Sequence, residues 1–208
     1  MNKYNTHSDL AKESLDLLKE GKHYQRKIEK KEDFSIETYE FLEDTEYLKK
    51  GKYILLSAHR EENIDTEENF YSLFNAINKM AEKYELPILY SCHPRSRKRL
   101  ENTGFELDRR VIQHEPLGFH DYNCLQMNAF CVVSDSGTLP EESSFFTSIG
   151  RSFPAVCIRT STERPEALDK AGFILSGIDE KGLLQAVEVA VEMNQNGDNG
   201  VPVPDYMD

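Results

Sequence analysis

The stretch YILLSAHREENIDTEENFYSLFNAINKMAEKYELPILYS, residues 53–91, decides the fold of this chain. Apolar runs typical of buried strands stand at its two ends, at 53–57 and 88–91. Asp65 followed by Glu68 resembles a capping box at the start of a helix between them. The side chains with amphipathic-helix spacing are Phe70, Leu73, Phe74, Ile77, Met80, Ala81 and Tyr84. Strand, helix and strand in this order predict a βα repeat around a parallel sheet.

The same alternation continues along the rest of the chain. A second clear amphipathic helix is expected after Asp179. Further strand-like runs occur at 111–113, 130–134, 155–158 and 173–175. Together they predict an α/β domain over 51–208, a Rossmann-like parallel sheet with helices on both faces. Ligands of such sheets collect beyond the carboxyl ends of the strands, so the polar residues that follow each strand are the candidates for a site.

The first 50 residues differ in composition, being dense in Lys and Glu with only sparse apolar positions. They predict one or two exposed helices. The run from Lys22 to Asp33 is almost entirely polar and predicts a mobile connector or solvated surface. Residues 1–50 are therefore expected to form a charged helical or connector segment.

The formal net charge of -12 opposes broad contact with nucleic acid or anionic lipid. A small anionic ligand is still compatible, because Arg, His and helix N-termini act over a few ångströms. No stretch approaches the roughly 20 apolar residues of a membrane-spanning helix, and residues 1–14 lack an apolar signal-peptide core. We expect a cytoplasmic protein with neither a membrane nor a nucleic-acid partner.

The cysteines are scattered without a CxxC pair, and most lie in or beside strand-like runs. They are Cys92, Cys124, Cys131 and Cys157. This pattern predicts free buried thiols rather than disulfides or a zinc site.

The turn SDSGTLPEE, residues 134–142, offers backbone N–H groups from 136–138 near the N-terminus of a helix that opens at Pro140. That geometry favours an anion. The alternative is that Ser136 merely caps the helix while the two glutamates complement its dipole. A dinucleotide site is disfavoured because no GxGxxG follows any strand.

His59 and Arg60 follow the first strand and could reach a phosphate or a developing negative charge. The sequence HREEN is not the HExxH metal motif, so Glu61 and Glu62 are interpreted as orienting Arg60 or as surface charge. His93 after the second strand is a similar candidate, although its Pro loop could serve only to end the strand.

Arg159 follows the fifth strand in CIRTSTERPE. With Arg164 it could neutralise a pyrophosphate, or the two could pair with Glu163 and Glu166. A serine hydrolase is disfavoured because GxSxG is absent and because Asp135 stands directly beside the serine rather than in position to orient a His.

The motifs SAHREEN (57–63), CHP (92–94), SDSGTLPEE (134–142) and RTSTERPE (159–166) resemble the C-terminal domain of the non-hydrolysing UDP-N-acetylglucosamine 2-epimerases over residues 52–206. The resemblance implies two Rossmann-like domains facing each other across a cleft, as in B-type glycosyltransferases, with this chain as the second domain. It implies inversion at C2 of a UDP-sugar by elimination of UDP to a glycal and re-addition, without nicotinamide or metal, so no cofactor is expected.

The resemblance also implies roles for individual residues. His59 matches the catalytic histidine near the departing phosphate. The substrate-binding set is Arg60, His93, Tyr122 at the uracil, Ser136, Gly137 and Thr138 at the diphosphate, Glu142 at the ribose, and Arg159 in the nucleotide site.

Thr138 and Pro140 stand where the family usually has Gly and Gln. They resemble the branch that makes UDP-N-acetyl-L-fucosamine for bacterial capsule or O-antigen. The carboxylates that act at C2 in the family belong to the other half, and residues 1–50 do not resemble it. Catalysis is therefore expected to need that N-terminal half or a homo-oligomer. The alternatives are a stand-alone UDP or UDP-sugar binding module and half of a B-type glycosyltransferase.

Overall fold

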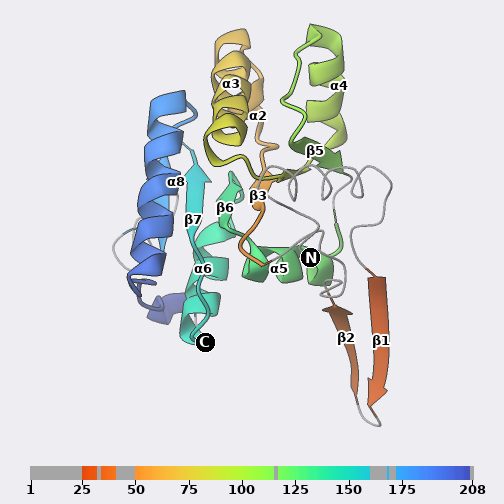
Figure 1. Ribbon diagram of the computed structural model, residues 1–208, viewed down its shortest axis with the longest axis vertical. Coiled ribbons are helices and arrows are strands. Elements are labelled where there is room, and N and C mark those ends of the chain that lie inside the picture. The colour runs from red at the N-terminus through yellow and green to blue at the C-terminus, as the bar shows by residue number, and fades with distance from the viewer. Residues whose placement is uncertain are drawn as a thin grey trace, which may run out of the picture.

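The computed structural model describes residues 25–31, 34–40, 50–114, 117–159, 168 and 172–206 (Figure 1). Its core is a six-stranded sheet of parallel strands in the order β5-β4-β3-β6-β7-β8. The strands are β3 (Ile54–Ser57), β4 (Ile88–Ser91), β5 (Val111–His114), β6 (Cys131–Ser134), β7 (Ala155–Ile158) and β8 (Phe173–Ser176). Every strand predicted from the sequence is confirmed within one residue at each end.

The order of the strands is that of a doubly wound nucleotide-binding sheet. The chain runs outward from β3 to β5 and then returns to place β6 on the other side of β3. Ser57 of β3 pairs with Ser91 of β4 and with Ser134 of β6, so the three strands end at one level. The direction of winding changes between β3 and β6, and the region beyond their carboxyl ends, where such sheets bind ligands, is called the crevice.

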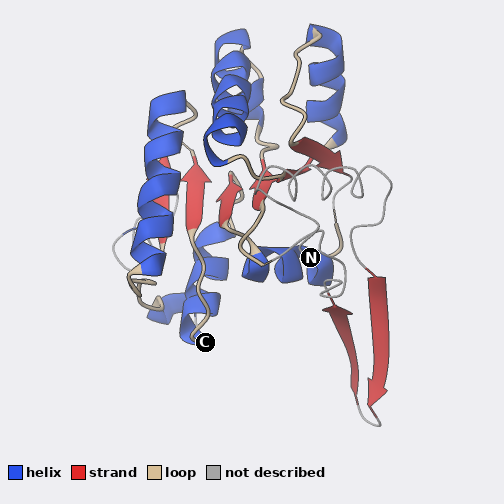
Figure 2. Ribbon diagram, viewed as in Figure 1, coloured by secondary structure: helices blue, strands red, loops and turns tan. Residues whose placement is uncertain are grey.

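Helices cover both faces of the sheet, as predicted (Figure 2). Ile54 and Leu56 face a core formed with α3 (Glu67–Tyr84), α4 (Pro94–Thr103) and α8 (Glu180–Gln195). Leu55 faces the opposite core with α5 (Phe119–Asn128), and α6 (Leu139–Ser148) covers Val132 on that side. This alternation follows from the two-residue period of a strand. The Rossmann-like fold is therefore confirmed.

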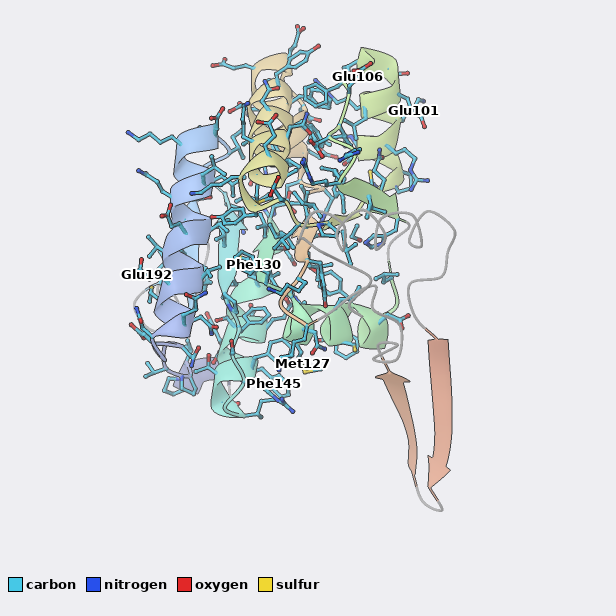
Figure 3. The ribbon with its side chains drawn as sticks, in the orientation of Figure 1. Glu101, Glu106, Met127, Phe130, Phe145 and Glu192 are labelled. Carbon is cyan, nitrogen blue, oxygen red and sulfur yellow. The ribbon has the colours of Figure 1, made fainter. Side chains whose placement is uncertain are left out.

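Charged side chains lie on the outer faces of α4 and α8. Glu101 and Glu192 point outward from α4 and α8 (Figure 3). A short 3-10 turn, η1 (Pro204–Tyr206), lies against α6. Among the residues described, no helix is both long and apolar enough to cross a membrane.

The start of α3 differs from the prediction. Its N-cap is Thr66, whose side chain accepts a hydrogen bond from the Asn69 backbone N–H, so the capping box at Asp65 and Glu68 is wrong. Asp65 instead ends the short helix α2 (Glu61–Ile64) and accepts a hydrogen bond from Arg95. The Asp65 side chain pairs with an arginine of another helix, and this contact cannot be read from the sequence around Asp65.

An antiparallel hairpin precedes the sheet, formed by β1 (Gln25–Lys31) and β2 (Phe34–Glu40). The expected helix or connector is wrong for these residues. Phe34, Ile36 and Thr38 alternate with polar residues, a two-residue period that suits a strand. Figure 1 shows the hairpin pointing away from the sheet. The other residues of 1–49 lie outside the described part of the chain.

All four cysteines are free, as predicted. Cys92, Cys131 and Cys157 are buried, while Cys124 on α5 is partly buried. Burial raises the pKa of the Cys157 thiol to about 11, which keeps it in the neutral form expected of a packing residue.

Candidate functional site

The loops that follow β3 and β6 meet at the crevice of the sheet. The Asp135 backbone N–H donates to the Ser57 carbonyl at 3.0 Å, which continues the pairing of the two strands past their ends. His59 and Arg60 therefore lie beside the turn at 135–138, and the structure brings together two of the motifs singled out in the sequence.

Asp135 holds the loop after β3 in place. Its side chain is fully buried, and Oδ2 accepts hydrogen bonds from the backbone N–H groups of His59 at 2.9 Å and Arg60 at 2.8 Å. The Asn63 amide donates to the same oxygen at 3.1 Å and to the Ile158 carbonyl at 3.0 Å. One carboxylate thus links the ends of β3, β6 and, through Asn63, β7.

The second oxygen of Asp135 faces the His59 ring. Oδ1 lies 3.3 Å from His59 Nδ1, and the Ser57 hydroxyl lies 3.3 Å from the same nitrogen. The His59 side chain is 45% exposed, and its Nε2 stands on the other side of the ring from Nδ1. Burial raises the pKa of Asp135, while the charge of His59 and the N–H donors act in the opposite direction.

This contact corrects the sequence interpretation of Asp135. Asp135 stands directly beside Ser136 and was not expected to be in position to orient a His, yet its carboxylate meets His59. Ser136 turns elsewhere, and its hydroxyl bonds the Thr138 hydroxyl at 2.9 Å. Sequence reasoning missed Asp135 and Asn63 because both act through contacts between residues more than 70 positions apart.

The Arg60 side chain lies over the turn after β6. Its Nε donates to the Asp135 carbonyl at 3.0 Å. A Cβ atom at Gly137 would lie 3.3 Å from Arg60 Nη2, closer than most such contacts. The absence of a side chain at Gly137 therefore gives the guanidinium room to lie against the turn.

The turn leads directly into α6. The N-cap of α6 is Thr138, whose side chain accepts no capping hydrogen bond from a backbone N–H of the helix, so the alternative that Ser136 caps the helix is wrong. Ser136 Oγ instead accepts from the Thr138 backbone N–H at 3.3 Å. Pro140 stands in the first turn, as predicted.

The Glu142 carboxylate folds back toward the turn. Oε1 accepts a hydrogen bond from the Thr138 hydroxyl at 2.8 Å, and Oε2 accepts one from the Gln126 amide at 2.6 Å. Glu142 is partly buried, whereas a residue that served only the helix dipole would need no such partners. Gln126 was missed, although an amide on the buried face of α5 is a signal that could have found it.

Tyr122 stands one turn before Gln126 on α5. Burial raises the pKa of its hydroxyl well above the usual range, and the charge of Glu142 adds to this effect. Hydrogen bonds from Ser134 and Ser57 act the other way. Tyr122 is therefore placed at the crevice, close to Glu142 and to the ends of β3 and β6.

Two arginines meet at one acidic side chain. Arg159 is 5% exposed, and its Nε lies 3.7 Å from Glu62 Oε1. Arg60 Nη1 lies 3.7 Å from the same oxygen. Of the two glutamates expected to orient Arg60 or to be surface charge, Glu62 thus pairs with Arg60, whereas Glu61 pairs with Arg95. The expected partners of Arg159 lie outside the described part of the chain. They are Glu163, Arg164 and Glu166.

His93 has a structural role in the fold. It is the exposed N-cap of α4, and its Nδ1 accepts a hydrogen bond from the Arg95 backbone N–H at 3.3 Å. Within the described ranges, no three His, Cys, Asp or Glu side chains are grouped to hold a metal ion.

The strand order defines a Rossmann-like α/β domain, and the polar residues described above lie at its switch point. The chain belongs to the UDP-N-acetylglucosamine 2-epimerase family, whose model matches residues 14–208. The UDP-N-acetylglucosamine 2-epimerase of Methanococcus maripaludis is 36% identical over 155 residues, which cover 73% of this chain and 41% of that protein.

Solved structures agree with the sequence comparison. The UDP-N-acetylglucosamine 2-epimerase from Rickettsia bellii has a TM-score of 0.64 and 38% identity, covering 76% of this chain and 41% of that one. The Methanocaldococcus jannaschii UDP-GlcNAc 2-epimerase in complex with UDP-GlcNAc and UDP has a TM-score of 0.60 and 31% identity, covering 67% and 38%. The chain thus spans about two fifths of the length of the relatives it matches.

Proposed function

We propose that this chain is the UDP-binding, C-terminal half of a UDP-N-acetylhexosamine 2-epimerase. The observation that carries the proposal is the anchored Glu142 carboxylate beside the turn at 136–138, at the switch point of the sheet. A carboxylate that accepts ribose hydroxyls next to N–H groups that bind phosphate is the combination that a nucleoside diphosphate requires. A relative of the same fold was solved with UDP-GlcNAc and UDP.

Each residue of the crevice has a proposed part in binding. The turn of Ser136, Gly137 and Thr138 holds the diphosphate, and Arg60 and Arg159 neutralise its charge. Glu142 accepts the ribose hydroxyls. Tyr122 lies against the uracil. His93 is the remaining candidate contact, in addition to capping α4.

His59 is the proposed catalytic residue. When the bond between C1 and the diphosphate oxygen breaks, negative charge develops on UDP, and an imidazole N–H nearby stabilises it or donates a proton. Loss of the C2 proton gives the glycal, and UDP then returns to C1 as a proton is added to the opposite face of C2. The acid and base at C2 are proposed to come from a second half or another copy of the chain.

The proposal for the substrate rests on Thr138 and Pro140. The residues at these two positions resemble those of the branch that forms UDP-N-acetyl-L-fucosamine. Such a product is a precursor of bacterial capsule or O-antigen, and its synthesis takes place in the cytoplasm. Family membership supports the epimerase over the B-type glycosyltransferase.

Titration calorimetry with UDP tests the proposal. We expect binding at about millimolar affinity, or about 4 kcal/mol, because only one side of the cleft is present. Circular dichroism verifies that the sample is folded, and adenosine diphosphate serves as the control for uracil recognition. A folded sample that gives no binding heat with millimolar UDP would overturn the assignment.

A further inference from the structure

We propose that Gln126 is a positioning residue that fixes the Glu142 carboxylate in the orientation that accepts the two ribose hydroxyls. This inference rests on the proposed function. Gln126 is 2% exposed, and its Nε2 donates to Glu142 Oε2 at 2.6 Å. A carboxylate only accepts hydrogen bonds, so the amide must present its NH₂ group to Glu142.

A second donor holds the other oxygen of the same carboxylate. The Thr138 hydroxyl donates to Glu142 Oε1 at 2.8 Å, from the opposite side of the group. The terminal torsion of a glutamate is otherwise broad. With one donor on each oxygen, this torsion is fixed, and each oxygen keeps a lone pair in a defined direction. Two parallel acceptors suit the two adjacent hydroxyls of a ribose.

The stability of the fold does not explain why a glutamine stands at position 126. Its Oε1 is buried and has no hydrogen-bond partner in the part of the chain that the structure describes. A buried acceptor without a partner destabilises the folded state, whereas an unbranched apolar side chain of similar length would fill the same space without that penalty. Compared with such an apolar side chain, the glutamine provides one further interaction, the hydrogen bond to Glu142.

The substitution Gln126→Met removes the donor and keeps the length of the side chain. We expect UDP affinity to fall about three- to tenfold, the loss of one positioned hydrogen bond, while affinity for inorganic pyrophosphate stays unchanged. The melting temperature should stay the same or rise. In a Glu142→Ala background, Gln126→Met should have no further effect on UDP binding, because nothing remains to be positioned.

Two other results have distinct meanings. If the folded wild-type chain does not bind UDP, the proposed function fails and this inference fails with it. If the wild type binds UDP and Gln126→Met binds it equally well, or loses pyrophosphate to the same degree, the inference alone is overturned. Gln126→Asn, whose amide is one methylene too short to reach Glu142, is the second variant. It must reproduce the selective loss of UDP affinity.

Discussion

His59 Nδ1 lies 3.3 Å from Asp135 Oδ1, although the two residues are 76 positions apart in the chain. The contact crosses the switch point of the sheet, because His59 follows β3 and Asp135 follows β6. The proposed catalytic imidazole therefore lies against the same loop that leads to the proposed diphosphate turn. Any displacement of that loop would move both groups together.

The buried Asp135 gives a prediction about pH. Burial raises its pKa above the value of about 4 that it has when unfolded, so the folded state holds its proton more tightly. This group thus contributes stability that is present below about pH 4 and is lost as the pH rises through the folded pKa. Relative to Asp135→Asn, the free energy of unfolding of the wild type should fall over that range. Urea unfolding of both proteins at several pH values measures the two free energies of unfolding. A wild-type free energy that rises with pH relative to that of Asp135→Asn would contradict the prediction.

Gly137→Ala tests the approach of Arg60 to the turn. The added Cβ would stand 3.3 Å from Arg60 Nη2, so the guanidinium must move by a few tenths of an ångström. UDP and pyrophosphate should both bind about two- to tenfold more weakly, because the displaced group contacts the diphosphate. Gly118→Ala is the matched control, since its Cβ meets Asp121 at an ordinary 3.6 Å. Equal effects of the two substitutions in calorimetry would refute the role of Arg60.

The proposed division of the active site predicts that this chain alone does not epimerise a UDP-N-acetylhexosamine. Proton transfer at C2 needs a positioned acid and base, each contributing about 10²–10⁴-fold. In the described part of the crevice, His59 is assigned to the departing phosphate and Glu142 to the ribose, while the Asp135 side chain is fully buried. Incubation of UDP-N-acetylglucosamine with the chain in deuterium oxide should leave C2 undeuterated by mass spectrometry. Deuterium at C2 would mean that this chain, alone or as an oligomer, supplies those groups.

The sheet was predictable from the sequence because its inner strands β3, β6 and β7 are buried on both faces and form nearly continuous apolar runs, such as 53–57. The helix after Asp179 was predictable from the helical spacing of its apolar residues, which is also a local pattern. The structure shows Asp179 as its N-cap. The hairpin β1–β2 was missed because the density of charge at 25–40 concealed its two-residue period.

The candidate site was predictable only in part. Position at a strand end identified His59, Arg60 and the turn after β6, since that property is local. The direction in which a side chain turns there depends on partners far away in the sequence. Asp135 meets His59 across two strands, and Gln126 meets Glu142 across two helices. No pattern within one motif encodes these contacts.

Glu142→Gln distinguishes a nucleotide site from a helix start. As a complement to the helix dipole, the carboxylate should tolerate the change with a loss of about 0.3–1 kcal/mol in stability and no effect on ligands. As the acceptor of both ribose hydroxyls, it should lose about 1.5–3 kcal/mol in UDP binding. Pyrophosphate, which has no ribose, should bind unchanged in calorimetry. Glu141→Gln is the control, because Glu141 lies about 100° away around the helix. Equal losses of UDP affinity in the two variants would identify Glu142 as part of the helix start alone.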